Sequence, residues 1–162
     1  MKTKLQAASV VLLSICILVV ATPRAAQKDS PMPHHATGSF EVKISPLDPA
    51  FKSDDNSIGR MSIDKQFHGA LEATSKGEML TGMGTVKGSG GYVAIERVTG
   101  TLDGRSGTFI LQHTGTMQNG VYNLNVTVVP DSGTNQLTGL QGSMTIIIKD
   151  GHHSYDFAYT LL

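Results

Sequence analysis

The sequence contains a few acid, base and hydroxyl side chains that could orient a small organic molecule or react with it. Glu96 and His113 are the candidate catalytic residues, because a neutral imidazole can act as a general base and a buried carboxyl group can move a proton. Five further side chains are candidate ligand-binding residues: Tyr92, Arg97, Tyr122, His153 and Tyr155. For each residue, packing or an ion pair in a subunit interface is the structural alternative.

Several familiar motifs are excluded by residue type and spacing. The stretch "GTLDGRSGTFILQH", from Gly100 to His113, has Arg105 where a phosphate-binding loop needs lysine, and a strand-like run follows where that loop needs a helix. "GRSGT" also lacks the Gly-x-Ser-x-Gly spacing of a hydrolase nucleophile. No group of Cys, His or carboxylate residues has the spacing of a metal site, so we expect neither a metal nor a cofactor.

These side chains must be positioned by β-strands, because apolar residues recur with a period of two and no segment after the N-terminus has a convincing helical period. Eight strands are expected, at about residues 35–45, 58–68, 70–81, 91–102, 107–115, 121–129, 139–149 and 152–161. Asp103 and Gly104 supply a tight turn, so the glycines of the quoted stretch are architectural. The segment 45–57 is the one long loop, a surface crossover or a lid over one end.

Eight sequential antiparallel strands bury their apolar faces and hide their edges best by closing on themselves. We therefore predict an all-β fold, an eight-stranded antiparallel β-barrel, with a two-sheet sandwich as the alternative. A barrel of this size is just wide enough to be filled by side chains or to hold one small ligand.

The antiparallel order places several candidate residues at one mouth of this barrel. His113 ends its strand there, and His153, Tyr92 and Tyr122 lie near the start of theirs. Alternation directs His113, His153, Tyr122 and Tyr155 into an otherwise apolar interior, which is the usual composition of a ligand pocket.

The strand at 91–102 has a less decisive pattern. Glu96 and Arg97 are adjacent and must face opposite ways, and both faces of this strand contain apolar residues. Either Glu96 or Arg97 therefore faces the interior, and the pattern leaves open which one.

The N-terminus has the composition of a secretory signal, with Lys2 and Lys4 before an apolar run and cleavage expected after Ala21 or Ala26. The predicted organisation is a signal peptide at 1–26, a linker at 27–34 and a single barrel domain at 35–162. The protein is then secreted or periplasmic. A translation start at Met32 would instead give a cytoplasmic protein.

The net charge argues against some classes of binding partner, and the cysteine content argues against a disulfide. Removing residues 1–26 leaves ten basic and 13 acidic residues, a net charge of about −3, which argues against nucleic acid or an anionic membrane as partner. The apolar run is short for a membrane span, so we expect no stable membrane anchor after processing. Cys16, the single cysteine, lies in that run, so the processed chain has no disulfide.

Four stretches, "ATGSFEVKI", "GALEATSKGEML", "YVAIERVTGTLDGRSGTFILQH" and "VVPDSGTNQLTGLQGSM", resemble a bacterial family of unknown function. The barrels of that family are similar to those of allene oxide cyclase and dirigent proteins. The resemblance implies an eight-stranded antiparallel barrel, and cyclisation, isomerisation or simple binding of small lipophilic molecules. No catalytic residue of the cyclases matches a position here. Members of the family mostly lack a signal sequence, so this chain departs from them.

Three hypotheses of function follow. The first is a binding protein for a small lipophilic or aromatic molecule held in the barrel. The second is an enzyme of the cyclase or isomerase kind that uses Glu96 or His113 in the same cavity. The third is a structural module that forms a homo-oligomer and has its interior filled by side chains.

Overall fold

The computed structural model describes residues 32–48 and 57–162. The predicted signal peptide, residues 27–31 of the predicted linker and most of the long loop lie outside these residues. Within the described part of the chain, no helix is long and apolar enough to cross a membrane.

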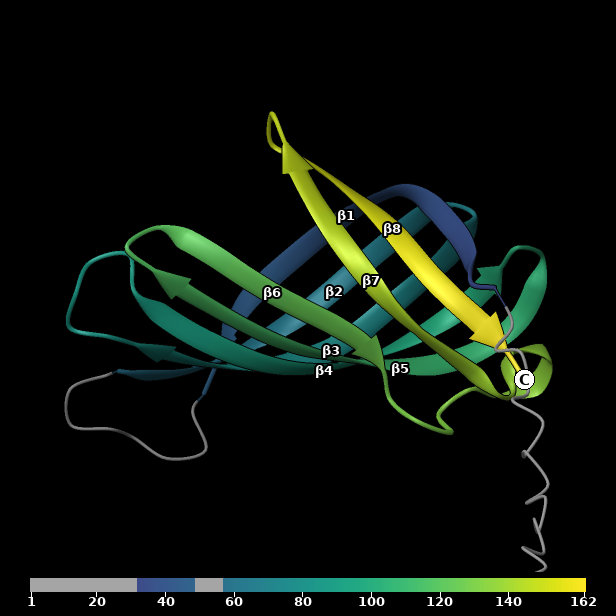
Figure 1. Cartoon of the computed structure of the whole chain (residues 1–162). Helices are drawn as coiled ribbons and strands as arrows, with labels where there is room; N and C mark the ends of the chain where they lie inside the picture. Colours follow the sequence, from purple (N-terminus) through teal and green to yellow (C-terminus); the bar gives the residue numbers. More distant parts are fainter. Residues whose placement is uncertain (1–31, 49–56) are drawn as a thin grey trace, which may run out of the picture. The chain divides into compact units, whose positions relative to one another are not determined.

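The described residues form eight antiparallel strands that follow one another around a barrel (Figure 1). The strands are β1 (His34–Leu47), β2 (Ile58–Gly69), β3 (Leu71–Met83), β4 (Gly90–Leu102), β5 (Arg105–Gln118), β6 (Val121–Val128), β7 (Leu140–Lys149) and β8 (His152–Leu161). One turn of 3-10 helix, η1 (Asn135–Leu137), precedes β7. Strand β1 pairs with both β2 and β8, so the sheet closes on itself. The barrel prediction is confirmed, and the sandwich is excluded.

The tight turn at Asp103–Gly104 forms where the sequence predicts it, and two other hairpins have turns of the same kind. Three hairpins turn on a pair of residues with positive φ, the first of them an Asp or Asn and the second a glycine. This is the chemistry of the two-residue turns whose twist matches the twist of the flanking strands. The pairs are Asp103–Gly104, Asn119–Gly120 and Asp150–Gly151.

One end of the barrel is filled by side chains. Leu71, Leu102, Phe109 and Phe157 are buried there, and η1 adds the buried Leu137. The hydroxyl of Tyr159 donates a hydrogen bond of 2.6 Å to Asp103 Oδ2, which ties β8 to the β4–β5 turn. We call this the closed end.

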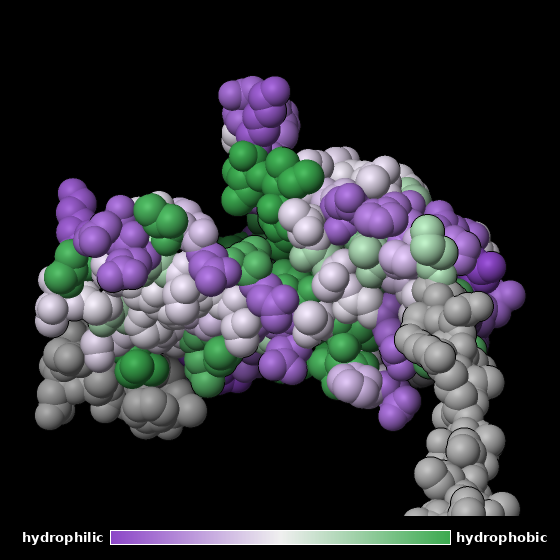
Figure 2. All heavy atoms as spheres, viewed as in Figure 1, coloured by the Kyte–Doolittle hydropathy of each residue, from purple (hydrophilic) through white to green (hydrophobic). Residues whose placement is uncertain are grey.

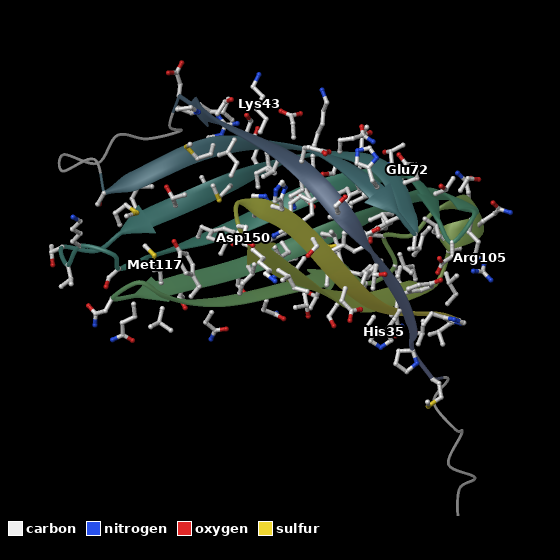
Figure 3. All side chains as sticks on the ribbon, turned by 90° about the horizontal axis from the view of Figure 1, so that it is seen from above. His35, Lys43, Glu72, Arg105, Met117 and Asp150 are labelled. Carbon is white, nitrogen blue, oxygen red and sulfur yellow. The ribbon has the colours of Figure 1, made fainter. Side chains whose placement is uncertain are left out.

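The opposite end is the open end. In Figure 3, Arg105 and Met117, near the two ends of β5, lie toward opposite ends of the barrel. Arg105 follows the turn at the closed end, and Met117 belongs to the open end. Any room for a ligand must lie toward Met117, because the closed end is already packed.

The seam between β6 and β7 differs from every other seam of the barrel. Only Thr127 and Ser143 are paired across it, whereas β5 and β6 pair continuously from Leu111↔Val128 to Gln118↔Val121. Strands β6 and β7 diverge from this point toward the open end (Figure 1). The barrel is closed at this seam by a single residue pair.

Candidate functional site

The open end contains a cavity of about 460 Å³. Val42, Ile63 and Ile146 are among its aliphatic lining residues. Three methionines also line it, Met79, Met83 and Met117. Methionine is unbranched and polarisable, so it adapts to ligands of irregular shape. The wall is therefore mainly apolar.

The cavity extends to the diverging strands at the β6–β7 seam. Leu124 of β6 and Ile148 of β7 both line it. Figure 2 shows hydrophobic side chains beside a hollow under the β7–β8 hairpin. Ile148, near the end of β7, is 67% exposed. The rim of the cavity at this seam is thus apolar and reachable from solvent.

A polar cluster of Lys65, Glu96 and His113 lies deep in the barrel. The Lys65 ammonium donates a hydrogen bond of 3.0 Å to Glu96 Oε1 and lies 2.9 Å from Oε2. His113 Nε2 lies 3.6 Å from Glu96 Oε1, slightly beyond hydrogen-bonding distance. The three residues are 8%, 0% and 2% exposed, so the cluster is shielded from bulk water.

Glu96 stays ionised in this setting. Burial by itself raises the pKa of a carboxyl group, because water no longer solvates the charge. Here the polar contact from His113 and the charge of Lys65 outweigh burial, so the pKa of Glu96 lies below its usual value. At neutral pH the cluster therefore contains a carboxylate held by an ammonium group.

The cluster has unused hydrogen-bonding capacity. Glu96 Oε2 and His113 Nε2 are buried without a hydrogen-bond partner, although Oε2 is in ionic contact with Lys65. Buried polar atoms are nearly always satisfied in folded proteins, so each exception calls for an explanation such as a bound water or a functional role. Lys65 and His113 line the cavity, whereas Glu96 lies behind them. The cavity is therefore lined by the two nitrogen-bearing residues of the cluster, with the carboxylate residue behind them.

A glycine explains how the cluster assembles. Gly77 of β3 is paired with Glu96 of β4, and Lys65 comes from β2 on the other side of β3. A Cβ added at Gly77 would lie 2.6 Å from Glu96 Cα and would also meet the Ile95 carbonyl oxygen. The missing side chain thus leaves room for Glu96, whose carboxylate meets Lys65 across β3.

Tyr92 lines the cavity beside the cluster. Its cross-strand partner is Gly115, where an added Cβ would overlap the Tyr92 ring. Burial, and secondarily the negative charge of Glu96, raise the pKa of the Tyr92 phenol. Tyr92 therefore remains protonated at neutral pH and can donate a hydrogen bond.

His153 and Tyr122 also line the cavity. The imidazole of His153 packs against Phe40 with ring centroids 5.1 Å apart. Tyr122 is 76% exposed and belongs to the rim rather than to the interior. Of the seven candidate site residues, the structure brings five together around the cavity: Tyr92, Glu96, His113, Tyr122 and His153, with Glu96 in the layer behind the lining.

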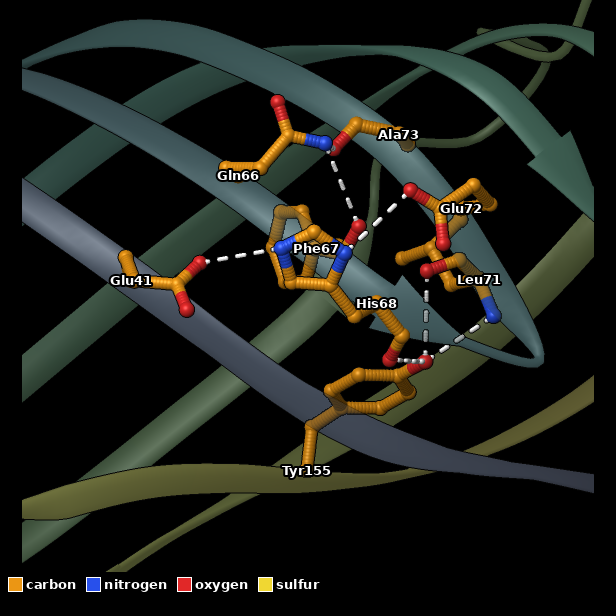
Figure 4. Close-up of polar contacts among 8 residues, drawn as sticks. All are labelled: Glu41, Gln66, Phe67, His68, Leu71, Glu72, Ala73 and Tyr155. Atoms are coloured by element: carbon orange, nitrogen blue, oxygen red, sulfur yellow. Dashed lines mark hydrogen bonds and ion pairs between the residues drawn. The ribbon is translucent and has the colours of Figure 1, made fainter.

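Arg97 and Tyr155 do not reach the cavity. Since Glu96 faces inward, Arg97 lies on the outer face of β4, where its Nη2 donates to Thr108 Oγ1 at 3.1 Å. Tyr155 lies toward the closed end, where its hydroxyl accepts a hydrogen bond of 2.9 Å from the Leu71 amide. The same hydroxyl lies 3.2 Å from the His68 carbonyl oxygen (Figure 4). Of the predicted ligand-binding residues, Arg97 and Tyr155 therefore lie away from the cavity lining. The strand pleat directs Arg97 outward, and backbone groups contact the Tyr155 hydroxyl.

Lys65 is the residue of the cluster that the sequence analysis does not identify. A signal for it exists, since Lys65 shares the inward parity of β2 with Ile63 and Phe67. A charged residue on an otherwise buried face indicates either a partner or a ligand. Its partner is on a strand that is not adjacent, so the sequence pattern alone does not reveal the pair.

Within the described residues, no group of three or more His, Cys, Asp or Glu side chains is arranged to hold a metal ion.

Comparison with known proteins gives one family and one solved structure of note. Residues 36–159 match the family described as "Protein of unknown function (DUF3224)". A crystal structure of a DUF3224 protein of unknown function from Shewanella oneidensis MR-1 is 48% identical, with a TM-score of 0.76 over 80% of this chain and 98% of that chain. No curated protein matches the sequence. The family match spans most of the chain and includes every residue of the polar cluster, and the chain therefore belongs to the DUF3224 family.

Proposed function

We propose that this protein binds a small lipophilic or aromatic molecule in the cavity at the open end. The observation that supports this most directly is a mainly apolar cavity of about 460 Å³ with one polar cluster at its wall. Ligand sites are typically about 300–1,000 Å³, mostly apolar, with a few placed polar groups. An interior filled by side chains, expected for a purely structural module, would not leave this space.

The proposal is tested by filling the cavity. Val42 lines it, and Val42→Phe adds bulk to the interior. Val93→Phe makes the same change on the outer face of β4, where Val93 is 52% exposed. The chain has no tryptophan, so binding of the neutral fluorophore phenylnaphthylamine can be followed without interference from indole emission.

We expect the wild-type protein and Val93→Phe to bind the fluorophore alike, and Val42→Phe to lose at least about tenfold in affinity. Equal binding by all three proteins would place the fluorophore outside the cavity. No binding by the wild-type protein would contradict the proposed function itself.

A second candidate function is catalysis of an isomerisation or cyclisation in the same cavity. It is favoured by the ionised Glu96 that lies 3.6 Å from a His113 nitrogen without a hydrogen-bond partner. This pair could move a proton within a bound molecule. The resemblance to allene oxide cyclase barrels, drawn from the sequence, points to the same reaction class.

The compound that copurifies with the protein distinguishes the binding hypothesis from the catalytic one. Isomers have the same mass but different chromatographic retention. An enzyme would yield one isomer with the wild-type protein and accumulate another with Glu96→Gln. The same compound from both proteins would favour binding alone.

The export predicted from residues 1–26 belongs to this proposal. A protein that binds lipophilic molecules outside the cytoplasm would carry compounds that water dissolves poorly. Detection of the full-length chain in the cytoplasm of its own host would contradict this location.

A further inference from the structure

The polar cluster constrains the chemistry of the ligand beyond its being lipophilic. Lys65 and His113 face the cavity, and the carboxylate of Glu96 lies behind them. A Lys ammonium has three donors and no acceptor. Glu96, the acid contacted by this ammonium, has two oxygens, at 3.0 and 2.9 Å. At least one donor of Lys65 is left for a ligand.

Within the cluster, Lys65 and Glu96 form an ion pair. The positive charge of Lys65 is already opposed by the fully buried Glu96. A ligand carboxylate would have to lose its hydration near a second carboxylate, without an unpaired cation to receive it. A ligand ammonium would meet Lys65 and His113 at the cavity wall, while Glu96 is held behind them. Ions of either sign are therefore disfavoured.

The packing of Lys65 supports the same conclusion. Its ammonium nitrogen lies 5.2 Å from the ring centroid of Phe40 and 5.6 Å from that of Phe67. Together with Glu96, these rings fix the Lys65 side chain at the wall of the cavity. A fixed donor selects for an acceptor atom at one position, rather than for any charged group that a flexible lysine could follow.

We infer that the ligand is a neutral, mainly apolar molecule with one oxygen acceptor, a carbonyl or a hydroxyl, which receives a hydrogen bond from Lys65. This inference rests on the proposed function, because it concerns the ligand of the same cavity. The apolar part of the molecule lies among the aliphatic and methionine side chains toward the rim.

The test is competition against bound phenylnaphthylamine by five compounds with the same chain length. They are decanone, decanol, decanoate, decylamine and decane, compared at about pH 8, where the acid is ionised and the amine is protonated. We expect decanone and decanol to bind at least about tenfold more tightly than the other three compounds. Tightest binding by decanoate or decylamine would overturn the inference, and so would equal binding of decanone and decane.

Variants assign the preference to Lys65. Lys65→Met removes the donor but leaves Glu96 without its cation, so Lys65→Met/Glu96→Met is tested beside it in case the single variant does not fold. In the double variant we expect the preference for decanone over decane to fall to about one. A preference for decanone that persists in the double variant would show that a group other than Lys65 donates the hydrogen bond to the ligand oxygen.

The matched control is Lys76→Met. Lys76 is 88% exposed on the outer face of β3 and lies 3.8 Å from Asp64. It should keep the full preference for decanone. If the wild-type protein binds the fluorophore and decanoate displaces it best, the proposed function stands and this inference fails. If the fluorophore does not bind at all, the proposed function fails.

Discussion

Glu96 is a carboxylate that is fully buried and held by the Lys65 ammonium. Each charge is costly to bury, and the attraction between the two offsets part of that cost. Removing Lys65 alone and removing both Lys65 and Glu96 should therefore have different effects on the free energy of unfolding.

Lys65→Met leaves the Glu96 charge without its cation and should lower the free energy of unfolding by about 3–5 kcal/mol. Lys65→Met/Glu96→Met removes both charges and should restore stability close to that of the wild-type protein. Urea denaturation measures the free energy of unfolding of both variants. Lys76→Met is the control, and it should shift this free energy by no more than about 0.5 kcal/mol. A double variant as unstable as the single one would show that the pair does not act as a unit.

The pH dependence of stability follows from the same pair. The folded-state pKa of Glu96 lies below its ordinary value of 4.5, because polar contacts with His113 and Lys65 outweigh burial. The folded state thus releases this proton more readily than the unfolded state does. The resulting stabilisation is fully present above about pH 4.5 and is lost as the pH falls through the folded-state pKa.

The difference in unfolding free energy between the wild-type protein and Glu96→Gln should accordingly shrink as the pH falls below about 4.5. Denaturation curves at a series of pH values measure this difference, in which the other carboxyl groups largely cancel. A difference that grows on acidification would mean that the pKa of Glu96 is raised in the folded state.

The inward orientation of Glu96 could not be decided from the sequence. Val93 and Ile95 share the outer face of β4 with Arg97 and are about half exposed, at 52% and 51%. In the sequence, this apolar outer face has the same pattern as a buried face. The two parities therefore look alike, and only the closed barrel distinguishes them.

At the scale of elements, glycines allow bulky inward side chains to fit in the barrel. Gly77 is paired with Glu96, Gly115 with Tyr92 and Gly142 with Tyr159. In each pair, a Cβ on the glycine would collide with the partner residue. Each glycine thus supplies the space that its partner fills.

Gly77→Ala should destabilise the protein by about 1–3 kcal/mol, because the new methyl group meets backbone atoms that must shift. Gly82→Ala, on the same strand, meets no atom closer than Ile58 Cδ1 at 3.8 Å and should be neutral or slightly stabilising. Thermal and urea denaturation compare the two. Equal effects would indicate that strand propensity, rather than space beside Glu96, governs these positions.

A second prediction at this scale concerns hydrogen exchange at the β6–β7 seam. Since Thr127↔Ser143 is the single pair across the seam, the amides of 121–125 and 145–149 that point toward it lack a partner strand. We expect alternate amides in these stretches to exchange hydrogen far faster than the amides of β3, which is paired on both edges. Hydrogen exchange followed by NMR measures this. Protection equal to that of β3 would mean that β6 and β7 are hydrogen-bonded along these stretches in solution.

Strand positions and turns were predictable because they depend on local patterns. Alternation of apolar residues located all eight strands, and Asp103–Gly104 located a turn of the type observed. The single pairing between β6 and β7 was not predictable, because it depends on how distant strands bend. The same limit applies to the meeting of Lys65 and Glu96 across β3.

At the scale of the whole molecule, the barrel is divided into a closed end packed with side chains and an open end with a cavity. The sequence predicted a barrel wide enough for either arrangement but not which one occurs, because that depends on the volumes of side chains from all eight strands. The grouping of Tyr92, His113 and His153 at one mouth was predictable from strand order alone.

The central claim is that the cavity holds a small molecule, and native mass spectrometry of protein isolated from its own host tests it most directly. The measurement compares the mass under gentle and denaturing conditions, and it also reports whether the N-terminus is cleaved and what the oligomeric state is. We predict an additional small-molecule mass that is lost on denaturation in the wild-type protein and is absent from Val42→Phe. A bare polypeptide under gentle conditions that also fails to take up added phenylnaphthylamine would contradict the claim.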